Sequence, residues 1–403
     1  MEMAESPPLK RVLTLPELVA YGVGTTVGAG IYVLIGKVAG LAGGYGIHAF
    51  LLSVIAVAMP AAAYAEFVGR LPYAAGEARY VAHGLRLPWL GAAVGLAVAL
   101  SGMLSSAALT LGAAGYLTHY LPISDRVIGL AMLAAMAAVV LMGIRQSVWL
   151  AGVVTLLEVG GLLAVIGAGL WHDPAAMAGV VLTPPPLSWS QWSNIIAATL
   201  LTFFAFIGFE DMVNVAEEAR DPERMIPRAI FLTLFITLFM YLAVFAAALV
   251  VATPAELAAS NAPLALVAGR YRPLNADIIS AVAITSVING VVVQMIMASR
   301  VVYGLARKGW LPAILARVHP RSRTPHMAIV LVWFIISLLA LAFPVAALAA
   351  STARVVMGVF ALVCLSLLLV KWRGETAPAS AFTAPWPVVA AGFVVCMLLL
   401  VFA

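Results

Sequence analysis

The sequence predicts an all-α membrane protein with about eleven transmembrane helices. Hydrophobic residues make up 64% of the 403 residues and charged residues 10%, against roughly 45–50% and about 25% in soluble domains. The apolar residues recur in runs of about 20, the length at which a helix spans a bilayer. The basic residues gather in alternate loops, which is typical of a chain that crosses a membrane repeatedly.

The apolar runs define the order of the predicted elements. The spans are 17–36, 45–68, 88–118, 126–143, 147–170, 191–215, 229–252, 276–303, 326–343, 354–370 and 386–402. The longest pieces between them are roughly 69–87, 171–190 and 304–325, which are too short for an independent soluble domain.

The distribution of basic residues predicts the orientation. With the N-terminus in the cytoplasm, only five of the 22 Lys and Arg residues fall outside, namely Lys37, Arg126, Arg270, Arg272 and Arg354. This positive-inside bias places the C-terminus outside after the eleventh span and predicts a multi-pass protein of the cell membrane. The net charge of +5 therefore reflects topology, and no nucleic-acid partner is expected. The N-terminus shows no signal-peptide cleavage pattern.

The first span carries the stretch "GVGTTVGAGIY" (22–32), which is rich in glycine. Glycine costs about 1 kcal/mol relative to alanine in a helix interior, so the stretch predicts a break at Gly28–Gly30. A broken helix exposes amides that suit a carboxylate and carbonyls that suit an ammonium group. Close packing of helices through the Gly24–Gly28 spacing is the alternative.

The sixth span contains a second interruption, "FFAFIGFED". Gly208 permits a break, and Glu210 and Asp211 would then lie at membrane depth, where charges are costly and usually functional. Alternatively, the span ends at Gly208 and the two acids lie at the interface. Two interrupted helices five spans apart indicate a transporter built from inverted repeats.

Several ordered stretches resemble one family. "TTVGAGIYVLIGKVAGLAG", "YAEFVGRLPYAAGEARYV", "FFAFIGFEDMVNVAEEARDPERMIPRAI", "SRVVYGLARKGWLP" and "VHPRSRTPHMAIV" resemble the amino acid–polyamine–organocation (APC) transporter superfamily over roughly residues 12–330. The resemblance implies a LeuT-like fold of two inverted five-helix repeats, with discontinuous helices 1 and 6, plus one extra helix. The division is a tail 1–14, repeats 15–170 and 171–370, and a final segment 371–403.

The resemblance also implies the positions of the substrate contacts. Amides of Gly28, Ala29 and Gly30 would bind the substrate carboxylate, and carbonyls of Thr26, Phe204 and Ile207 would bind its ammonium group. Phe204 falls where the family places an aromatic lid, and Glu210 where some members carry a proton-sensing acid. The family's common twelfth helix is missing from the eleven predicted spans, so the oligomeric state stays open.

Glu158 is an isolated acid within the fifth span. In some similar relatives a lysine at this position takes the place of a sodium ion. Glutamate has the opposite charge, so this mechanism does not apply to Glu158. Glu158 is expected to carry a proton, or to bind a cation together with Ser286, because intramembrane acids are costly and usually functional. The alternative is a protonated structural acid. We expect no cofactor and no structural metal. The expected coupling species is a proton or a sodium ion.

A mixed-charge cluster follows the sixth span. Its residues are Glu217, Glu218, Arg220, Asp221, Glu223, Arg224 and Arg228. A solvated, salt-bridged face is the simpler interpretation; a cytoplasmic gate, in which Arg70 or Arg79 pairs with this cluster at Glu218, is the alternative.

The sequence predicts an amino acid transporter that works by proton-linked uptake or by exchange, with polyamine or organic amine transport and sodium coupling as alternatives. Six scattered histidines provide no catalytic constellation, so no enzyme is expected. Cys364 and Cys396 lie in apolar runs and suggest neither a metal site nor a disulfide. Small or polar candidates for the substrate pocket, including Ser101, Ser105, Ser106, Thr202, Asn289 and Gln294, favour neutral amino acids.

Overall fold

The computed structural model describes residues 13–402 except 29, 73–75, 119–120, 143–147, 272–273, 308 and 320–323. Apart from one isolated bridge between Leu13 and Ala219, all regular structure in this described part is helical. The elements are α1 (Leu15–Val27), α2 (Gly30–Ala42), η1 (Gly43–Tyr45), α3 (Gly46–Arg70), α4 (Gly76–Leu85), α5 (Pro88–Leu117), α6 (Asp125–Met142), α7 (Val148–His172), α8 (Pro174–Leu182), α9 (Trp189–Ala205), η2 (Phe209–Glu218), α10 (Pro222–Val251), α11 (Pro254–Ala259), α12 (Pro263–Arg270), α13 (Ala276–Arg307), η3 (Ala313–Ala316), α14 (His326–Ala342), α15 (Val345–Trp372) and α16 (Trp386–Phe402).

Local sequence signals set many helix starts. The helices α5, α8, α10, α11 and α12 all begin at a proline, whose fixed φ suits the first helical position and whose missing N–H is not needed there. At the start of α1, the Glu17 carboxylate accepts hydrogen bonds from the Thr14 amide at 2.8 Å and the Thr14 hydroxyl at 2.7 Å, so the backbone N–H that precedes the helix is satisfied.

The chain is an all-α polytopic membrane protein. Within the described residues, eight helical stretches are long and apolar enough to cross a membrane, and Gly30–Arg70 counts as one of them although it joins α2, η1 and α3. The apolar helices His326–Ala342 and Trp386–Val401 are shorter. The number eleven and the two inverted repeats therefore stay predictions.

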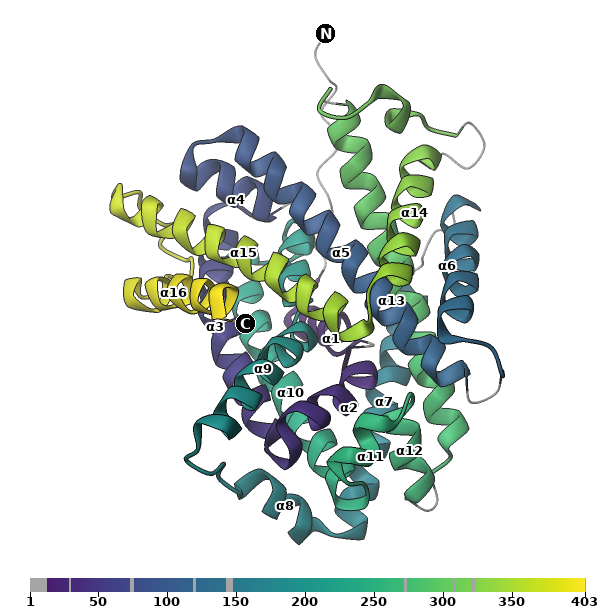
Figure 1. Cartoon of the computed structure of the whole chain (residues 1–403). Helices are drawn as coiled ribbons and strands as arrows, with labels where there is room; N and C mark the ends of the chain where they lie inside the picture. Colours follow the sequence, from purple (N-terminus) through teal and green to yellow (C-terminus); the bar gives the residue numbers. More distant parts are fainter. Residues whose placement is uncertain are drawn as a thin grey trace.

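The short connecting helices mark two ends of the bundle (Figure 1). α4 and η3 lie toward one end, which we name the α4 end, and α8, α11 and α12 lie toward the opposite end, the α8 end. The prediction places the loops 69–87 and 304–325 on one side of the membrane and the loop 171–190 on the other, and this separation of the short helices agrees with it. The predicted orientation, with the N-terminus in the cytoplasm, stays a prediction.

Packing brings the two broken helices to the middle of the bundle. α2 packs against α9, α1 packs against α10 and η2, and α10 also packs against α3, while α5 packs against α13 and α15. Small residues permit these contacts: a methyl group on Gly24 of α1 would lie 2.5 Å from Thr155 Oγ1 of α7, and one on Gly22 would lie 2.5 Å from Met212 Sδ of η2. Gly24 therefore packs closely against α7, whereas Gly28, the other residue of the predicted spacing, approaches no other helix within the described residues.

Three predicted boundaries are wrong. Arg354, predicted at the outer start of the tenth span, lies inside α15, which already starts at Val345; Thr352 fits into this helix because its hydroxyl is buried and donates to the Leu348 carbonyl. The loop expected at 253–275 contains α11 and α12. The sixth span, predicted to end at residue 215, continues beyond its break as the 3₁₀ helix η2 and ends at Glu218.

Candidate functional site

The first transmembrane helix is interrupted at its glycines. α1 ends at Val27 and α2 begins at Gly30, with Gly28 at φ 15° and ψ −160° between them. Ala29 lies outside the described residues. The first amides of α2 have no intrahelical carbonyl partner, and the helix dipole is positive at this end. Among the described residues outside its chain neighbours, a methyl group on Gly28 would meet only the Thr25 carbonyl within 4 Å.

The sixth helix is interrupted at Gly208. α9 ends at Ala205, and Gly208 adopts φ 128° before η2 begins, a backbone conformation that favours glycine. The two breaks touch here, because a side chain on Gly208 would overlap the Thr25 carbonyl. The Thr25 hydroxyl also donates to the Gly208 carbonyl at 3.0 Å. Both predicted discontinuities are therefore present, and they lie against one another.

Tyr241 of α10 connects the two breaks. Its buried hydroxyl lies 2.9 Å from the Thr26 carbonyl oxygen, 3.3 Å from that of Val27 and 2.8 Å from that of Ala205. It thus satisfies carbonyls that the broken helices leave without amide partners. Sequence reasoning missed this residue, because a tyrosine in an apolar helix is most simply interpreted as packing.

Phe204 lies beside the start of α2, and Ile207 follows the end of α9; their role in binding an ammonium group stays a prediction. Phe204 is 5% exposed, and a methyl group on Gly30 would be 3.8 Å from its ring, so the aromatic side chain faces the start of α2. The Phe204 carbonyl accepts from the Ile207 amide at 3.2 Å. Thr26 is buried, and its Oγ1 has no hydrogen-bond partner within the described part.

Glu158 lies beside the first break and not in contact with lipid. It is 2% exposed and interacts electrostatically with Tyr32 of α2 and with Tyr241. Its carboxyl lies near Ser286 of α13, although the buried Ser286 hydroxyl makes no hydrogen bond of ordinary geometry to a described residue. The structure therefore brings an acid and an unsatisfied hydroxyl together next to the broken helix.

Glu210 lies just below the second break. One carboxyl oxygen accepts from the Gly208 amide at 2.8 Å, so the acid caps the start of η2. It also interacts electrostatically with Asp211 and Glu77. Among the described residues, Glu210 and Glu158 have different partners, so the two acids are separate groups.

The predicted gate residues have other partners or lie outside the described side chains. Arg70 donates to Glu66, its i−4 neighbour, at 2.8 Å and to the Glu375 carbonyl at 2.8 Å. The side chain of Glu218 lies outside the described ones. An Arg70–Glu218 gate therefore stays a prediction.

Several of the polar side chains expected to line a pocket are satisfied inside the bundle. The Ser106 hydroxyl donates to the Gly102 carbonyl, and the Thr202 hydroxyl donates to the Ala49 carbonyl at 3.0 Å. By contrast, the Gln294 Oε1 atom is buried without a partner among the described residues and lies beside Gly102. Gln294 is thus the candidate best placed to meet a polar ligand.

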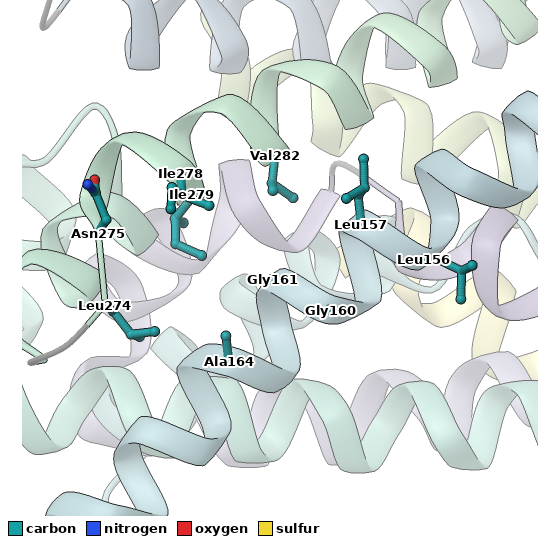
Figure 2. Close-up of a pocket in the computed structure, with 10 residues that line it drawn as sticks. All are labelled: Leu156, Leu157, Gly160, Gly161, Ala164, Leu274, Asn275, Ile278, Ile279 and Val282. Atoms are coloured by element: carbon teal, nitrogen blue, oxygen red, sulfur yellow. The ribbon is translucent and has the colours of Figure 1, made fainter.

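A separate groove of about 340 Å³ runs between α7 and α13 (Figure 2). Leu156, Leu157 and Ile278 on its walls are 74%, 49% and 62% exposed, as expected for side chains that face acyl chains. Gly160 and Gly161 form its floor. The groove therefore belongs to the lipid-facing surface and not to the site at the breaks.

Two discontinuous helices meet in mid-bundle, and a buried acid lies beside them. This arrangement is typical of a class of helical membrane proteins that bind a polar solute near the bilayer midplane. Within that class, the chain belongs to the amino acid permease family, whose family model matches residues 13–403. The predicted resemblance is confirmed.

Named relatives agree with this assignment. The chain is 29% identical over 388 residues to "Cationic amino acid transporter 2, vacuolar" of Arabidopsis thaliana, covering 90% of this chain and 60% of that protein. It is 26% identical over 345 residues to "Branched-chain amino acid permease BcaP" of Bacillus subtilis, covering 81% and 73%. It is 27% identical over 413 residues to "Cationic amino acid transporter 4" of Mus musculus, covering 94% and 62%. These names describe transporters and a permease, not enzymes. The chain spans less than two-thirds of the two cationic amino acid transporters.

Proposed function

We propose that this chain is a secondary active transporter that moves an amino acid across the membrane by alternating access. The observation that carries the proposal is the contact between two broken helices in mid-bundle. The start of α2 offers free amides to a carboxylate, and the carbonyls near Thr26 and Ala205 offer acceptors to an ammonium group. These complementary ends suit the zwitterionic part shared by all amino acids.

Tyr241 supplies a step in the proposed cycle. In the present conformation its hydroxyl donates to carbonyls from both breaks. An incoming ammonium group competes for the same carbonyls, so substrate binding loosens this bridge while the Phe204 ring covers the bound molecule. The resulting change in contact between α1, α9 and α10 couples occupancy to the rocking of one helix group against the other.

Glu158 is the proposed coupling group. An ionised carboxylate without a cation partner is unfavourable in a low-dielectric interior, and the described surroundings of Glu158 provide tyrosines and Ser286 rather than a lysine or arginine. A proton neutralises the acid directly. A sodium ion held by Glu158 and the unsatisfied Ser286 hydroxyl is the other coupling species that this group supports.

A neutral amino acid is the proposed substrate. The backbone groups at the breaks recognise every amino acid equally, so selectivity depends on the surrounding side chains. A thermal-shift screen of the purified protein against the twenty amino acids identifies the class, because a ligand that binds the folded state raises its apparent stability. If only lysine and arginine raised the apparent stability of the protein, the substrate would be a cationic amino acid and not a neutral one.

Replacing Glu158 by glutamine tests the coupling. We expect Glu158→Gln in proteoliposomes to abolish the pH dependence of uptake while exchange between internal and external substrate continues, because glutamine cannot gain or lose a proton at this position. The measurement is labelled uptake as a function of external pH, with and without sodium. If uptake by Glu158→Gln kept the pH dependence and the sodium dependence of the wild type, Glu158 would not be the coupling group. If the variant lost only its sodium dependence, the coupling ion would be sodium and not a proton.

A further inference from the structure

A group of basic side chains surrounds Glu375, in the segment that follows α15 at the α4 end. The Glu375 carboxylate lies 2.7 Å from Arg373 Nε, 3.7 Å from Arg86 Nη2 and 3.0 Å from His83 Nε2. Both arginines approach the same carboxylate oxygen, Oε1. Arg373 also donates to the Gly84 carbonyl at 2.7 Å, so these contacts join the end of α15 to α4. We call the group of Glu375, His83, Arg86 and Arg373 the Glu375 cluster.

Two features of its arginines distinguish this cluster. Within the described part of the chain, Arg86 at φ 57° is the only residue other than glycine with a positive φ. Such backbone strain occurs more often at binding sites than elsewhere. The Nη2 donor of Arg373 is buried and has no hydrogen-bond partner among the described residues, although buried polar atoms are nearly always paired. The cluster therefore has donor capacity that its own carboxylate does not use.

Positive charge exceeds negative charge in and around the cluster. The hydrogen bond from Arg373 lowers the pKa of Glu375, so this carboxyl is ionised at neutral pH and provides one negative charge against two arginines. The neighbouring Glu66 likewise faces two cations, Arg70 at 2.8 Å and Lys371 at 2.7 Å. Arg70 connects the two groups, because it also donates to the Glu375 carbonyl at 2.8 Å. Among the described ion pairs, four Lys and Arg side chains thus face two carboxylates, and a further anion would offset the excess.

Three exposed tryptophans place the cluster at the level of lipid headgroups. Trp89 lies in the first turn of α5, Trp372 is the last residue of α15, and Trp386 is the first residue of α16. Their exposed fractions are 57%, 83% and 58%. Tryptophan is enriched where membrane helices pass into the headgroup region. Because α4 packs against α5 and α15, and α15 packs against α16 (Figure 1), the cluster lies among these helix ends and faces headgroups as well as water.

The charge and the depth of the cluster together select its ligand. Guanidinium groups bind phosphate oxygens through paired hydrogen bonds, and Lys and Arg side chains close to a membrane surface attract anionic lipids. The Arg86 side chain is 72% exposed, so a headgroup reaches it from the bilayer surface. A dissolved phosphate offers the same oxygens, but only a lipid also places acyl chains against the tryptophans.

We propose that the Glu375 cluster binds the headgroup phosphate of an anionic phospholipid, with Arg86 and Arg373 as its main contacts. The bound phosphate offsets the excess positive charge and links the corner between α4 and α5 to the end of α15. The protein is therefore stabilised by anionic lipid beyond the effect of zwitterionic lipid. This site is separate from the two helix breaks and from Glu158, and it does not depend on the proposed function.

Thermal unfolding of the purified protein in detergent tests the site. The protein is titrated separately with phosphatidylglycerol, phosphatidylcholine and inorganic phosphate, because a ligand that binds the folded state raises the Tm. We expect phosphatidylglycerol to raise the Tm more than phosphatidylcholine does, and inorganic phosphate to leave it unchanged. Arg86→Gln and Arg373→Gln should each require about fivefold more phosphatidylglycerol for the half-maximal shift, the contribution of one cation near an anionic lipid surface. Arg317→Gln, which removes an exposed arginine next to η3 at the same end, is the matched control and should respond as the wild type does.

Each other outcome of these titrations overturns the proposal. Equal responses of the wild type to the two lipids would exclude a site for anionic lipid, and this comparison requires no variant to fold. Wild-type behaviour of both Arg86→Gln and Arg373→Gln, or an equal loss in Arg317→Gln, would show that anionic lipid does not bind at the Glu375 cluster. A shift with inorganic phosphate as large as that with phosphatidylglycerol would mean that the site takes a dissolved phosphate and not a lipid. Amino acid transport does not enter the measurement, so each of these results leaves the transporter proposal intact.

Discussion

Tyr241 shows how a single side chain sets the geometry of a broken-helix site. Breaking a membrane helix leaves carbonyls without partners, and in a bilayer each of these costs several kcal/mol. One hydroxyl, within 2.8–3.3 Å of three such carbonyls, connects the two breaks. In the proposed cycle, a substrate ammonium group competes for the same carbonyls.

The first prediction concerns this hydroxyl. Tyr241→Phe should lower the free energy of unfolding by about 1–3 kcal/mol, because it leaves buried carbonyls unsatisfied while keeping the ring. Reversible unfolding in mixed detergent micelles measures the change. A variant as stable as the wild type, with unchanged substrate affinity, would show that the bridge does not support the site.

The sequence predicts only some of these residues. The glycines of "GVGTTVGAGIY" and Gly208 are visible as poor helix formers in apolar runs, so both breaks were predictable. Tyr241 gives no such signal, because its role depends on carbonyls 215 and 36 residues away in the sequence.

Among the elements, the break in the sixth helix depends on backbone conformation. Gly208 has φ 128°, and a side chain there would overlap the Thr25 carbonyl. Gly208→Ala should therefore disrupt the contact between the breaks, with a strain of about 1–3 kcal/mol before any steric overlap. Substrate-induced thermal shift and folded yield measure the effect.

Gly358 of α15 provides the control for this substitution. A methyl group there would meet no heavy atom within 4 Å, and alanine favours a helix over glycine by about 1 kcal/mol. Gly358→Ala should therefore fold and bind normally. Equal behaviour of the two variants would contradict a special requirement for glycine at the break.

A buried ion cluster holds α3, α15 and α16 together. Glu66 of α3 is 0% exposed and contacts Arg70 at 2.8 Å, Lys371 of α15 at 2.7 Å, and the Ala384 amide, just before α16, at 2.8 Å. The sequence does not reveal this cluster, because Glu66 lies near the end of the second predicted span and Lys371 just after the tenth. Each of the two side chains could equally have faced water at a helix end.

Glu66→Gln should destabilise the protein by about 3–5 kcal/mol, because it leaves Arg70 and Lys371, which are only partly exposed, without the buried carboxylate between them. Chemical unfolding in detergent measures this loss. Asp125→Asn, at an exposed helix start, should change the stability by less than about 1 kcal/mol. A similar small change in Glu66→Gln would mean that the cluster is not important for holding these helices.

For the whole molecule, composition and charge distribution predict an all-α membrane protein, and the fold and the family assignment confirm that class. The finer arrangement is harder to predict. Short helices such as α8, α11 and α12 form at one end of the bundle because loop segments with a proline start and some apolar residues pack on neighbouring helices, and periodicity over six to nine residues is too short to show this.

The central claim is that the two breaks form a carrier site for an amino acid, and counterflow tests it most directly. Proteoliposomes loaded with an unlabelled amino acid from the thermal-shift screen are diluted into a trace of the labelled form. We predict a transient accumulation of label above equilibrium, retained in Gly358→Ala and lost in Gly208→Ala. Label that only equilibrates, at the same rate with empty and loaded vesicles, would contradict the claim and indicate a channel or a protein that does not transport amino acids.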